Sequence, residues 1–279
     1  MREKVLVAGL GEVGSALYEI IKDSNRYELY GYDIDPRRTV NKLEDIPERV
    51  DYIHICVPFK DTEHFVKVVG QYIDRYLPDF VIIHSTVAPG TTREIYKAKG
   101  VPVAFSPVRG KHPFLKSHML FWPKWVCALP REYTEVFVEH LKSVKLNAKG
   151  YYGEPETLEL AKIFETTYRA LLIAWWQEMH RIARHFNADI LAIAEFIGEI
   201  HEKLKDKPPM FPGVIGGHCL IPNTEILYRV YKSKFLEAIL ESNAKRADEI
   251  KDPSIREEVS KLQELVKKYI VLEYYEGKV

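Results

Sequence analysis

The segment best suited to covalent chemistry is Gly-Gly-His-Cys-Leu-Ile-Pro-Asn, at residues 216–223. Its cysteine, Cys219, is one of three in the chain, and a thiolate can capture a carbonyl carbon as a nucleophile. The paired glycines expose backbone donors, and His218 adjoins the sulfur. A free cysteine is also often a small buried residue, so both interpretations of Cys219 stay open. Cys56 and Cys127 are predicted to be core residues.

A second motif places Gly9, Gly11 and Gly14 between a predicted strand and a predicted helix. Glycines at this spacing allow a tight turn and let a pyrophosphate approach the backbone at the helix N-terminus. Asp33 follows 19 residues after Gly14, at the end of the next predicted strand. A carboxylate there accepts hydrogen bonds from ribose hydroxyls and repels a 2′-phosphate, which favours NAD over NADP.

Arg37 and Arg38 follow closely and weaken the preference for NAD. The alternative is that the glycines are plain turn residues and that Asp33 is a solvated strand end. NAD is the predicted cofactor, and the residues predicted to bind it are Gly9, Gly11, Glu12, Val13, Gly14, Asp33, Val57, Pro58 and Thr86.

Basic side chains gather after a further predicted strand, in residues 109–118. They could clamp a phosphate or a carboxylate, or they could form a solvated loop. The five side chains are Arg109, Lys111, His112, Lys116 and His118. No Cys-x-x-Cys or Cys/His cluster predicts a metal site.

The composition of this 279-residue chain limits the classes of partner that it is expected to bind. Forty basic and forty acidic side chains balance, and no Lys/Arg block draws it to nucleic acid or a membrane surface. With no apolar run of membrane-spanning length and an odd number of cysteines, we expect a cytoplasmic protein that binds a small molecule. Charged residues at 29% and three glutamines resemble the composition of thermophilic proteins.

Strand patterns alternate with crossovers in the first part of the chain, at 4–9, 28–35, 50–58, 80–86 and 101–107. Such alternation predicts a parallel, doubly wound sheet. We therefore expect an α/β fold with an NAD-binding Rossmann domain over 1–150, followed by an all-helical substrate and dimerisation domain over 151–279.

A long helix is predicted over 155–186, which has no internal Gly or Pro and is apolar around most of its circumference. Two more helical patterns follow at about 224–250 and 254–272. The apolar side chains of the long helix exceed what a small domain covers, which predicts a homodimer. They include Leu158, Phe164, Leu171, Leu172, Trp175 and Trp176.

Three segments behind the glycine turn resemble the UDP-glucose/GDP-mannose dehydrogenase family. They are His-Ser-Thr-Val-Ala-Pro-Gly-Thr-Thr-Arg-Glu-Ile at 84–95, the helical segment 161–179, and Gly-Gly-His-Cys-Leu-Ile-Pro-Asn at 216–223. The resemblance covers most of residues 1–250. It implies a shortened form without the C-terminal domain that binds the nucleotide of the sugar nucleotide.

The resemblance implies an enzyme that oxidises a primary alcohol twice with two NAD, through an aldehyde and a cysteine thioester. By position, Cys219 matches the nucleophile, Lys162 the cation that stabilises oxyanion intermediates, and Thr86 the hydroxyl that helps to place water. Lys162 could instead be a surface residue that extends its ammonium to solvent, since an unpaired charge on an apolar helix is costly.

Three positions depart from the family pattern. Thr166 stands where the family has Asn, Asn223 where it has an Asp that assists proton removal, and Val108 where many members have Glu. Asn223 cannot take a proton and Val108 cannot position water, although Thr166 can donate one hydrogen bond. The second oxidation and the hydrolysis are therefore the doubtful steps.

The sequence thus predicts an NAD-dependent oxidoreductase that acts on an alcohol or aldehyde carrying an anionic group, with Cys219, Lys162, Thr86, Thr166 and Asn223 as its catalytic set. Two alternatives remain. One is a β-hydroxyacid or 6-phosphogluconate-type dehydrogenase, which uses a lysine on the same long helix. The other is a dinucleotide-binding sensor or subunit without turnover.

Overall fold

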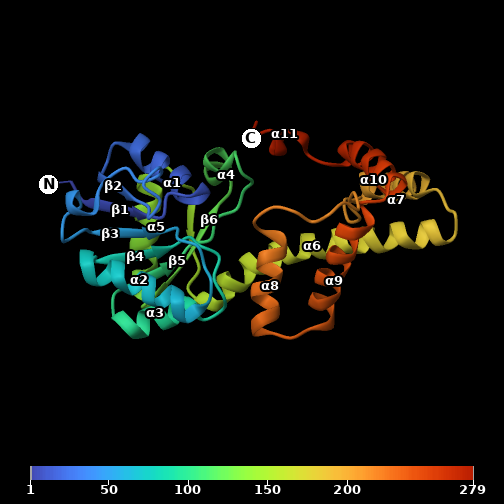
Figure 1. The fold of residues 1–279 in the computed structure, drawn as a ribbon. Helices are drawn as coiled ribbons and strands as arrows, with labels where there is room; N and C mark the ends of the chain where they lie inside the picture. The colour runs from blue at the N-terminus through green and yellow to red at the C-terminus, as the bar shows by residue number, and fades with distance from the viewer. Residues whose placement is uncertain (1, 279) are drawn as a thin grey trace. The chain divides into compact units, whose positions relative to one another are not determined.

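The N-terminal part of the chain forms a seven-stranded sheet in the computed structural model, which describes residues 2–278 (Figure 1). The strand order is β2-β1-β3-β4-β5-β6-β7, and every neighbouring pair is parallel except β5 and β6. The expected α/β fold is confirmed. The strands are β1 (Lys4–Ala8), β2 (Glu28–Tyr32), β3 (Tyr52–Ile55), β4 (Phe80–Ile83), β5 (Val103–Phe105), β6 (Lys124–Leu129) and β7 (Ala148–Gly150).

Alternate residues of the strands point to opposite sides of the sheet, and helices bury both of these faces. Val5 and Val7 share one core cluster with apolar residues of α1 (Glu12–Ser24) and α5 (Thr134–Ser143). Leu6 shares the opposite cluster with residues of α2 (Thr62–Tyr76) and α3 (Thr91–Lys99). In Figure 1, α2 and α3 lie together on one side of the strands and α1 on the other.

Short elements complete this part of the chain. They are α4 (Leu115–Phe121) and two single 3₁₀ turns, Leu43–Asp45 and Arg131–Tyr133. The sequence patterns identified β1 to β5 but not β6 or β7. The antiparallel β6 carries Lys124 and Trp125 on a strand whose partners are distant in sequence, so local alternation did not reveal it.

Helices alone make up the C-terminal part. The predicted long helix is confirmed as α6 (Pro155–His185). Trp176 and Ala183 of α6 share a core with Ile190 of α7 and with Leu262 and Leu265 of α10. The remaining helices are α7 (Ile190–Leu204), α8 (Leu220–Val230), α9 (Lys234–Glu249), α10 (Pro253–Val266), a 3₁₀ turn (Lys267–Tyr269) and α11 (Leu272–Tyr275).

The prediction of one helix over 224–250 is wrong, because two helices occupy this range. Helix α8 ends at Val230, and Tyr231 is extended. Ser233 then caps α9, since its side chain accepts a hydrogen bond from the amide of Phe235. A serine N-cap starts a new helix by satisfying an unpaired N–H group.

The chain divides into two compact units. One comprises Met1–Lys162 with Glu276–Val279, and the other comprises Ile163–Tyr275. The boundary falls inside α6, so Lys162 belongs to the first unit and Thr166 to the second. Within residues 2–278, no helix is both long and apolar enough to cross a membrane.

Candidate active site

The glycine turn joins the end of β1 to the start of α1. Gly9 has φ +88°, in the left-handed region that favours glycine. A Cβ on Gly14 would lie 1.7 Å from the carbonyl oxygen of Gly9, so residue 14 cannot carry a side chain. Gly11 is the N-cap of α1. The N–H groups and the dipole of a helix N-terminus favour a bound phosphate, so this geometry fits a pyrophosphate.

The segments after β3 and β4 lie beside the glycine turn. A Cβ on Gly9 would lie 2.9 Å from the amide nitrogen of Val57, which follows β3. Ser85, which follows β4, donates a hydrogen bond to the carbonyl oxygen of Val57 at 2.6 Å. Val57, Pro58 and Thr86 thus belong to segments at the carboxyl edge of the sheet, where open α/β sheets bind ligands.

Asp33 lies directly after β2 and is 9% exposed. Its Oδ2 accepts a hydrogen bond from the amide of Leu10 at 2.6 Å, and its Oδ1 accepts one from the amide of Asp35 at 2.8 Å. Each carboxylate oxygen has a second acceptor position that a ribose hydroxyl could use. Arg38 Nη1 lies 3.7 Å from where a Cβ on Gly11 would be, so a guanidinium also adjoins the turn.

Glu159 fastens the loop that carries Thr86 to helix α6. The Glu159 carboxylate accepts hydrogen bonds from the amide of Gly90 at 2.6 Å and from the amide and hydroxyl of Thr92 at 2.9 and 2.6 Å. These groups form the start of α3, where a carboxylate is stabilising. Burial raises the pKa of Glu159. Lys162 follows three residues later on α6 and is half-buried.

Three buried histidines form a hydrogen-bonded chain between the sheet and α5. His54 Nδ1 is 2.9 Å from His84 Nε2, and His54 Nε2 is 2.9 Å from His140 Nε2. His84 Nδ1 is 2.9 Å from the carbonyl oxygen of Ser106, which can only accept, so His84 Nδ1 carries a proton. In neutral rings this assigns the other tautomers: His54 donates to His84, and His140 donates to His54.

Burial lowers the pKa of all three histidines, that of His140 to about 3. At the other end of the chain, Lys124 donates to the carbonyl oxygens of Ser106 and Pro107 at 2.6 and 2.9 Å. Burial lowers the pKa of Lys124 to about 7. This network was not predicted from the sequence, although the alternation in Tyr-Ile-His-Ile indicates a histidine on a buried face of the sheet.

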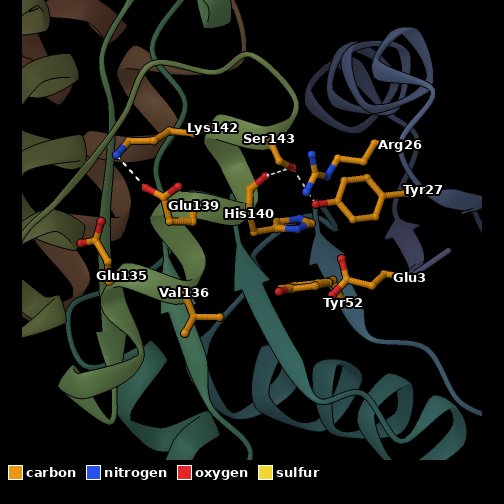
Figure 2. Close-up of a pocket in the computed structure, with 10 residues that line it drawn as sticks. All are labelled: Glu3, Arg26, Tyr27, Tyr52, Glu135, Val136, Glu139, His140, Lys142 and Ser143. Carbon is orange, nitrogen blue, oxygen red and sulfur yellow. Dashed lines mark hydrogen bonds and ion pairs between the residues drawn. The ribbon is translucent and has the colours of Figure 1, made fainter. Parts of the chain in front are cut away.

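His140 also lines the pocket drawn in Figure 2. Tyr52 stacks on the His140 ring with centroids 3.7 Å apart, and the Tyr27 hydroxyl lies 2.6 Å from Ser143 Oγ. None of the predicted catalytic or cofactor residues lies here, so this pocket is not the predicted site. Its lining residues are Glu3, Arg26, Tyr27, Tyr52, Glu135, Val136, Glu139, His140, Lys142 and Ser143.

Cys219 is exposed and forms the N-cap of α8. Gly217 before it has φ +82°, and the amide of Asn223 donates to the carbonyl oxygen of Cys219 at 2.9 Å. The alternative of a buried packing residue is therefore wrong for Cys219. Cys127 is buried as expected and Cys56 is partly buried; burial raises the pKa values of these two thiols to about 11 and about 12.

Thr166 and Asn223, the two departures from the family pattern, contact each other in the second unit. Asn223 Nδ2 donates to Thr166 Oγ1 at 3.1 Å. Both side chains are buried. The Thr166 hydroxyl itself donates to the carbonyl oxygen of Ile163 at 2.8 Å. The hydrogen-bond donor expected of Thr166 is thus directed to its own helix. Val108, the third departure, is buried in the sheet core of the first unit.

Two of the five basic side chains in the loop 109–118 are engaged in local contacts. Lys116 forms ion pairs with Glu19 and Asp23 at 3.2 and 2.8 Å. His118 is buried, and its Nδ1 accepts a hydrogen bond from the amide of Lys111 at 2.9 Å. The side chains of Lys116 and His118 thus stabilise the local structure. Within residues 2–278, no group of three or more His, Cys, Asp or Glu side chains is placed to hold a metal ion.

The central part of the chain is similar to a known family of proteins. Residues 156–248 match the model of the UDP-glucose/GDP-mannose dehydrogenase family, central domain. The chain is 28% identical over 310 residues to a UDP-N-acetyl-D-mannosamine dehydrogenase of Methanocaldococcus jannaschii, and the match covers 96% of this chain. A protein of the same name from Methanococcus maripaludis strain C7 is 25% identical over 86% of this chain.

Solved structures share the fold. UDP-D-ManNAc dehydrogenase from Pyrococcus horikoshii superposes with a TM-score of 0.73 at 19% identity, over 87% of this chain and 68% of that one. A Mycobacterium tuberculosis 3-hydroxyisobutyrate dehydrogenase superposes with a TM-score of 0.64 at 12% identity, over 94% of this chain and 99% of that one.

The chain spans 70% and 65% of the lengths of the two curated relatives, so it is shorter than both. The matched segment contains Lys162, Thr166, Cys219 and Asn223. The resemblance that these residues and the Gly-Gly-His-Cys loop implied is confirmed over this segment: residues 156–248 match the central domain of the UDP-glucose/GDP-mannose dehydrogenase family, and the chain as a whole is similar to the longer UDP-N-acetyl-D-mannosamine dehydrogenases.

Proposed function

We propose that this chain is an NAD-dependent dehydrogenase that oxidises the primary alcohol, or the derived aldehyde, of a nucleotide sugar such as UDP-N-acetyl-D-mannosamine. The observation that carries the proposal is Cys219, exposed at the start of α8 in the Gly-Gly-His-Cys loop and inside the segment that matches the family. An exposed thiol after a glycine pair is accessible to an aldehyde carbon.

The first unit supplies a turn that fits a dinucleotide. Gly9, Gly11 and Gly14 would hold the pyrophosphate at the N-terminus of α1, and Asp33 would accept hydrogen bonds from the adenosine ribose. When bound, NAD supplies the hydride acceptor for oxidation at a substrate carbon. Arg38 beside Gly11 makes the choice between NAD and NADP a matter for direct measurement.

Cys219 has the role of holding the aldehyde. Its sulfur adds to the carbonyl carbon, the π electrons move to the oxygen, and that oxygen takes a proton to give a thiohemiacetal. Lys162, by its match to the family, stabilises the negative charge that develops on the oxygen. Covalent capture prevents release of a reactive aldehyde between two oxidations.

The buried pair Thr166 and Asn223 limits the second half of this chemistry. Asn223 cannot accept a proton from water, and the Thr166 hydroxyl donates within α6. We infer that the first two-electron oxidation is retained and that formation of the acid is slow.

The test is to incubate the protein with NAD and, separately, UDP-N-acetyl-D-mannosamine, UDP-N-acetyl-D-glucosamine and UDP-glucose. Reduced cofactor is followed by absorbance, and aldehyde and acid are quantified by mass spectrometry. One reduced cofactor per sugar means that the reaction stops at the aldehyde, and two mean that it reaches the acid. Cys219→Ala should abolish acid formation. Binding of NAD without turnover of any nucleotide sugar would contradict the proposal and favour the sensor alternative.

A β-hydroxyacid dehydrogenase is the second candidate, favoured by a fold likeness that extends over nearly the whole of both chains. Such an enzyme needs no cysteine nucleophile. Turnover of a β-hydroxyacid or of 6-phosphogluconate that survives Cys219→Ala would therefore select it.

A homodimer through α6 is part of the proposal. Two of the apolar residues predicted for this contact, Leu158 and Trp176, are instead buried within the chain. Leu172 is partly buried, and the other three are exposed. Together with two residues that were not predicted, Tyr168 and Ile182, these three leave an exposed stripe with steps of three, four and seven residues, as one face of a helix requires. We define this α6 stripe as Phe164, Tyr168, Leu171, Trp175 and Ile182, which are 39–62% exposed. We also propose a cytoplasmic location, which fits three cysteines that form no disulfide within residues 2–278.

A further inference from the structure

The loop that precedes Cys219 is fastened to two helices at alternate residues. Gln177 of α6 donates through Nε2 to the carbonyl oxygen of Gly213 at 2.8 Å. Asn243 of α9 accepts from the amide of Ile215 at 2.7 Å through Oδ1, and donates back to the carbonyl oxygen of Ile215 at 3.2 Å through Nδ2. One asparagine side chain thus pairs with both backbone groups of a single residue.

A second layer of contacts holds the two amides in place. Gln177 Oε1 accepts a hydrogen bond from Ser242 Oγ at 2.8 Å, and Gln177 Nε2 lies 3.4 Å from Asn243 Oδ1. Arg181 donates to Ser242 Oγ and to the carbonyl oxygen of Ser242, both at 3.0 Å. Gln177 is fully buried. Asn243 is partly buried. Hydrogen-bonded amides that are wholly or partly buried favour one arrangement of the chain, and losing a partner is costly.

The hydrogen bonds from Gln177 and Asn243 reach the loop at Gly213 and Ile215, just before the glycine pair. Ile215 is 5% exposed and shares a core cluster with Ala170 and Ala174 of α6 and Ile239 of α9. The next four residues, 216–219, are all exposed. Gly213 and Ile215 are buried and hydrogen-bonded, whereas Val214 between them is exposed. Ile215 is the last buried residue of the loop, four positions before Cys219.

We propose that Gln177 and Asn243 are positioning residues for Cys219: by holding the backbone of Gly213 and Ile215 against α6 and α9, they fix the point from which the exposed Gly-Gly-His-Cys segment starts. Neither side chain touches the reacting atoms. The inference rests on the proposed function for its effect on turnover. Its structural part, the order of the loop, is measurable without a substrate.

Asparagine suits this task because its side chain both donates and accepts, like the backbone of a neighbouring strand. In Asn243→Asp, the carboxylate could still accept a hydrogen bond from the amide of Ile215. Its charged form has no proton to donate to the carbonyl oxygen of Ile215, so that hydrogen bond is lost. A protonated aspartic acid restores the donor. In Asn243→Asp, both hydrogen bonds to the backbone of Ile215 should therefore form again on acidification.

The experiment compares wild type with Asn243→Asp and with Gln177→Glu, which removes the donor to Gly213 in the same way. Hydrogen exchange of the Ile215 amide reports the order of the loop. Initial rates with NAD and UDP-N-acetyl-D-mannosamine give kcat and the KM for NAD. Ser233→Ala is the matched control, because it removes the N-cap of the same helix α9 without touching the loop.

Above about pH 7 we expect the Ile215 amide to exchange at least about tenfold faster in Asn243→Asp than in wild type, with kcat lower by about 10- to 100-fold. The KM for NAD should stay within about twofold, because the glycine turn belongs to the other unit. Lowering the pH to about 5 should raise the kcat ratio of Asn243→Asp to wild type, because partial burial raises the pKa of the introduced carboxyl and a larger fraction of it becomes protonated. Ser233→Ala should show neither effect.

Equal losses in Ser233→Ala and Asn243→Asp, or a kcat ratio that is flat with pH, would reduce the two amides to a general role in stability and overturn the inference. If Asn243→Asp does not fold, Gln177→Glu is subject to the same criteria. If wild type oxidises no nucleotide sugar, the proposed function fails. The effect of Gln177 and Asn243 on the order of the loop is then tested by hydrogen exchange alone. Unchanged protection of the Ile215 amide in both variants would overturn the inference.

Discussion

The side-chain amide of Asn223 donates a hydrogen bond to the hydroxyl of Thr166 at 3.1 Å, and that hydroxyl donates to the carbonyl oxygen of Ile163 at 2.8 Å. The two side chains are 5% and 4% exposed. The direction of proton donation along this pair is therefore set toward the backbone of α6. Asn223 lies one turn after Cys219 on α8 and cannot serve as a base there. The Thr166 hydroxyl of α6 cannot take this role either.

Asn223→Asp should restore a proton acceptor at this position and increase acid formation from the nucleotide-sugar aldehyde by about 10²-fold, the usual size of a general-base contribution. The ratio of reduced cofactor to sugar should move from one toward two. Quantifying aldehyde and acid by mass spectrometry checks this. Asn223→Leu, of similar size, is the control and should leave the ratio at one. No gain with aspartate would show that the second oxidation is limited elsewhere.

Acid should destabilise the fold through the buried histidines. Burial lowers the pKa values of His54, His84 and His140 in the folded chain, whereas an unfolded histidine titrates near about 6.5. Below about pH 6.5 the unfolded chain binds protons that the folded chain does not, so the free energy of unfolding falls with pH. With a folded pKa of about 3, His140 alone accounts for roughly 2 kcal/mol at about pH 5.

Urea unfolding between about pH 7.5 and pH 5 measures this slope. His140→Gln keeps a donor toward His54 but removes one titrating group, so its slope should be shallower by about one proton. His64, which is exposed, provides the matched control variant His64→Asn. A wild-type free energy of unfolding that is constant over this range would contradict the buried neutral chain of histidines.

Asp33→Ala should weaken NAD binding by about 1–3 kcal/mol and NADP binding by less, because hydrogen bonds from ribose hydroxyls to a charged carboxylate are lost. Asp33 also accepts hydrogen bonds from the amides of Leu10 and Asp35, so the variant should unfold at a lower temperature. Titration calorimetry below that temperature separates the two effects. Arg38→Ala is the opposing control and should weaken NADP more than NAD. Equal losses of both cofactors in Asp33→Ala would remove Asp33 from the ribose site.

Iodoacetamide should modify Cys219 at least about 10²-fold faster than Cys56 or Cys127, whose pKa values burial raises to about 12 and about 11. Peptide mapping by mass spectrometry after native-state labelling gives the three rates. We expect labelling of Cys219 to slow in Lys162→Met and to slow again when NAD and a nucleotide sugar are present. Uniform slow labelling of all three cysteines would exclude Cys219 as a nucleophile.

The α6 stripe should hold two copies of the chain together at micromolar concentration. Replacing Trp175, which is 56% exposed, by Glu places a charge in the apolar contact and should produce a monomer in light scattering. Phe235→Glu is the control, since Phe235 is 77% exposed on α9, outside the stripe. A wild-type monomer, or a dimer that both variants preserve, would rule out this interface.

Much of the architecture and part of the candidate site follow from the sequence itself, because they depend on neighbours in the chain. The Gly9–Gly14 turn is set by local sterics, and the φ of +88° at Gly9 follows from the same requirement. Helix α6 was predictable because its 31 residues contain no internal Gly or Pro and repeat at helical spacing. The Gly-Gly-His-Cys loop was identified by residue type alone.

Tertiary structure decided which distant groups meet. Asn223 and Thr166 are 57 residues apart, Glu159 and Gly90 are 69 apart, and His54 and His140 are 86 apart. Periodicity and capping describe contacts within a few residues, so they assign each side chain to a face but not to a partner. The break between α8 and α9 was missed for a related reason: the Ser233 cap is local, yet the apolar pattern continues across it. Two distant side chains become hydrogen-bond partners when the faces that carry them pack together. Burial makes an unpaired amide, carboxylate or imidazole costly, so the folded chain pairs these groups in one way.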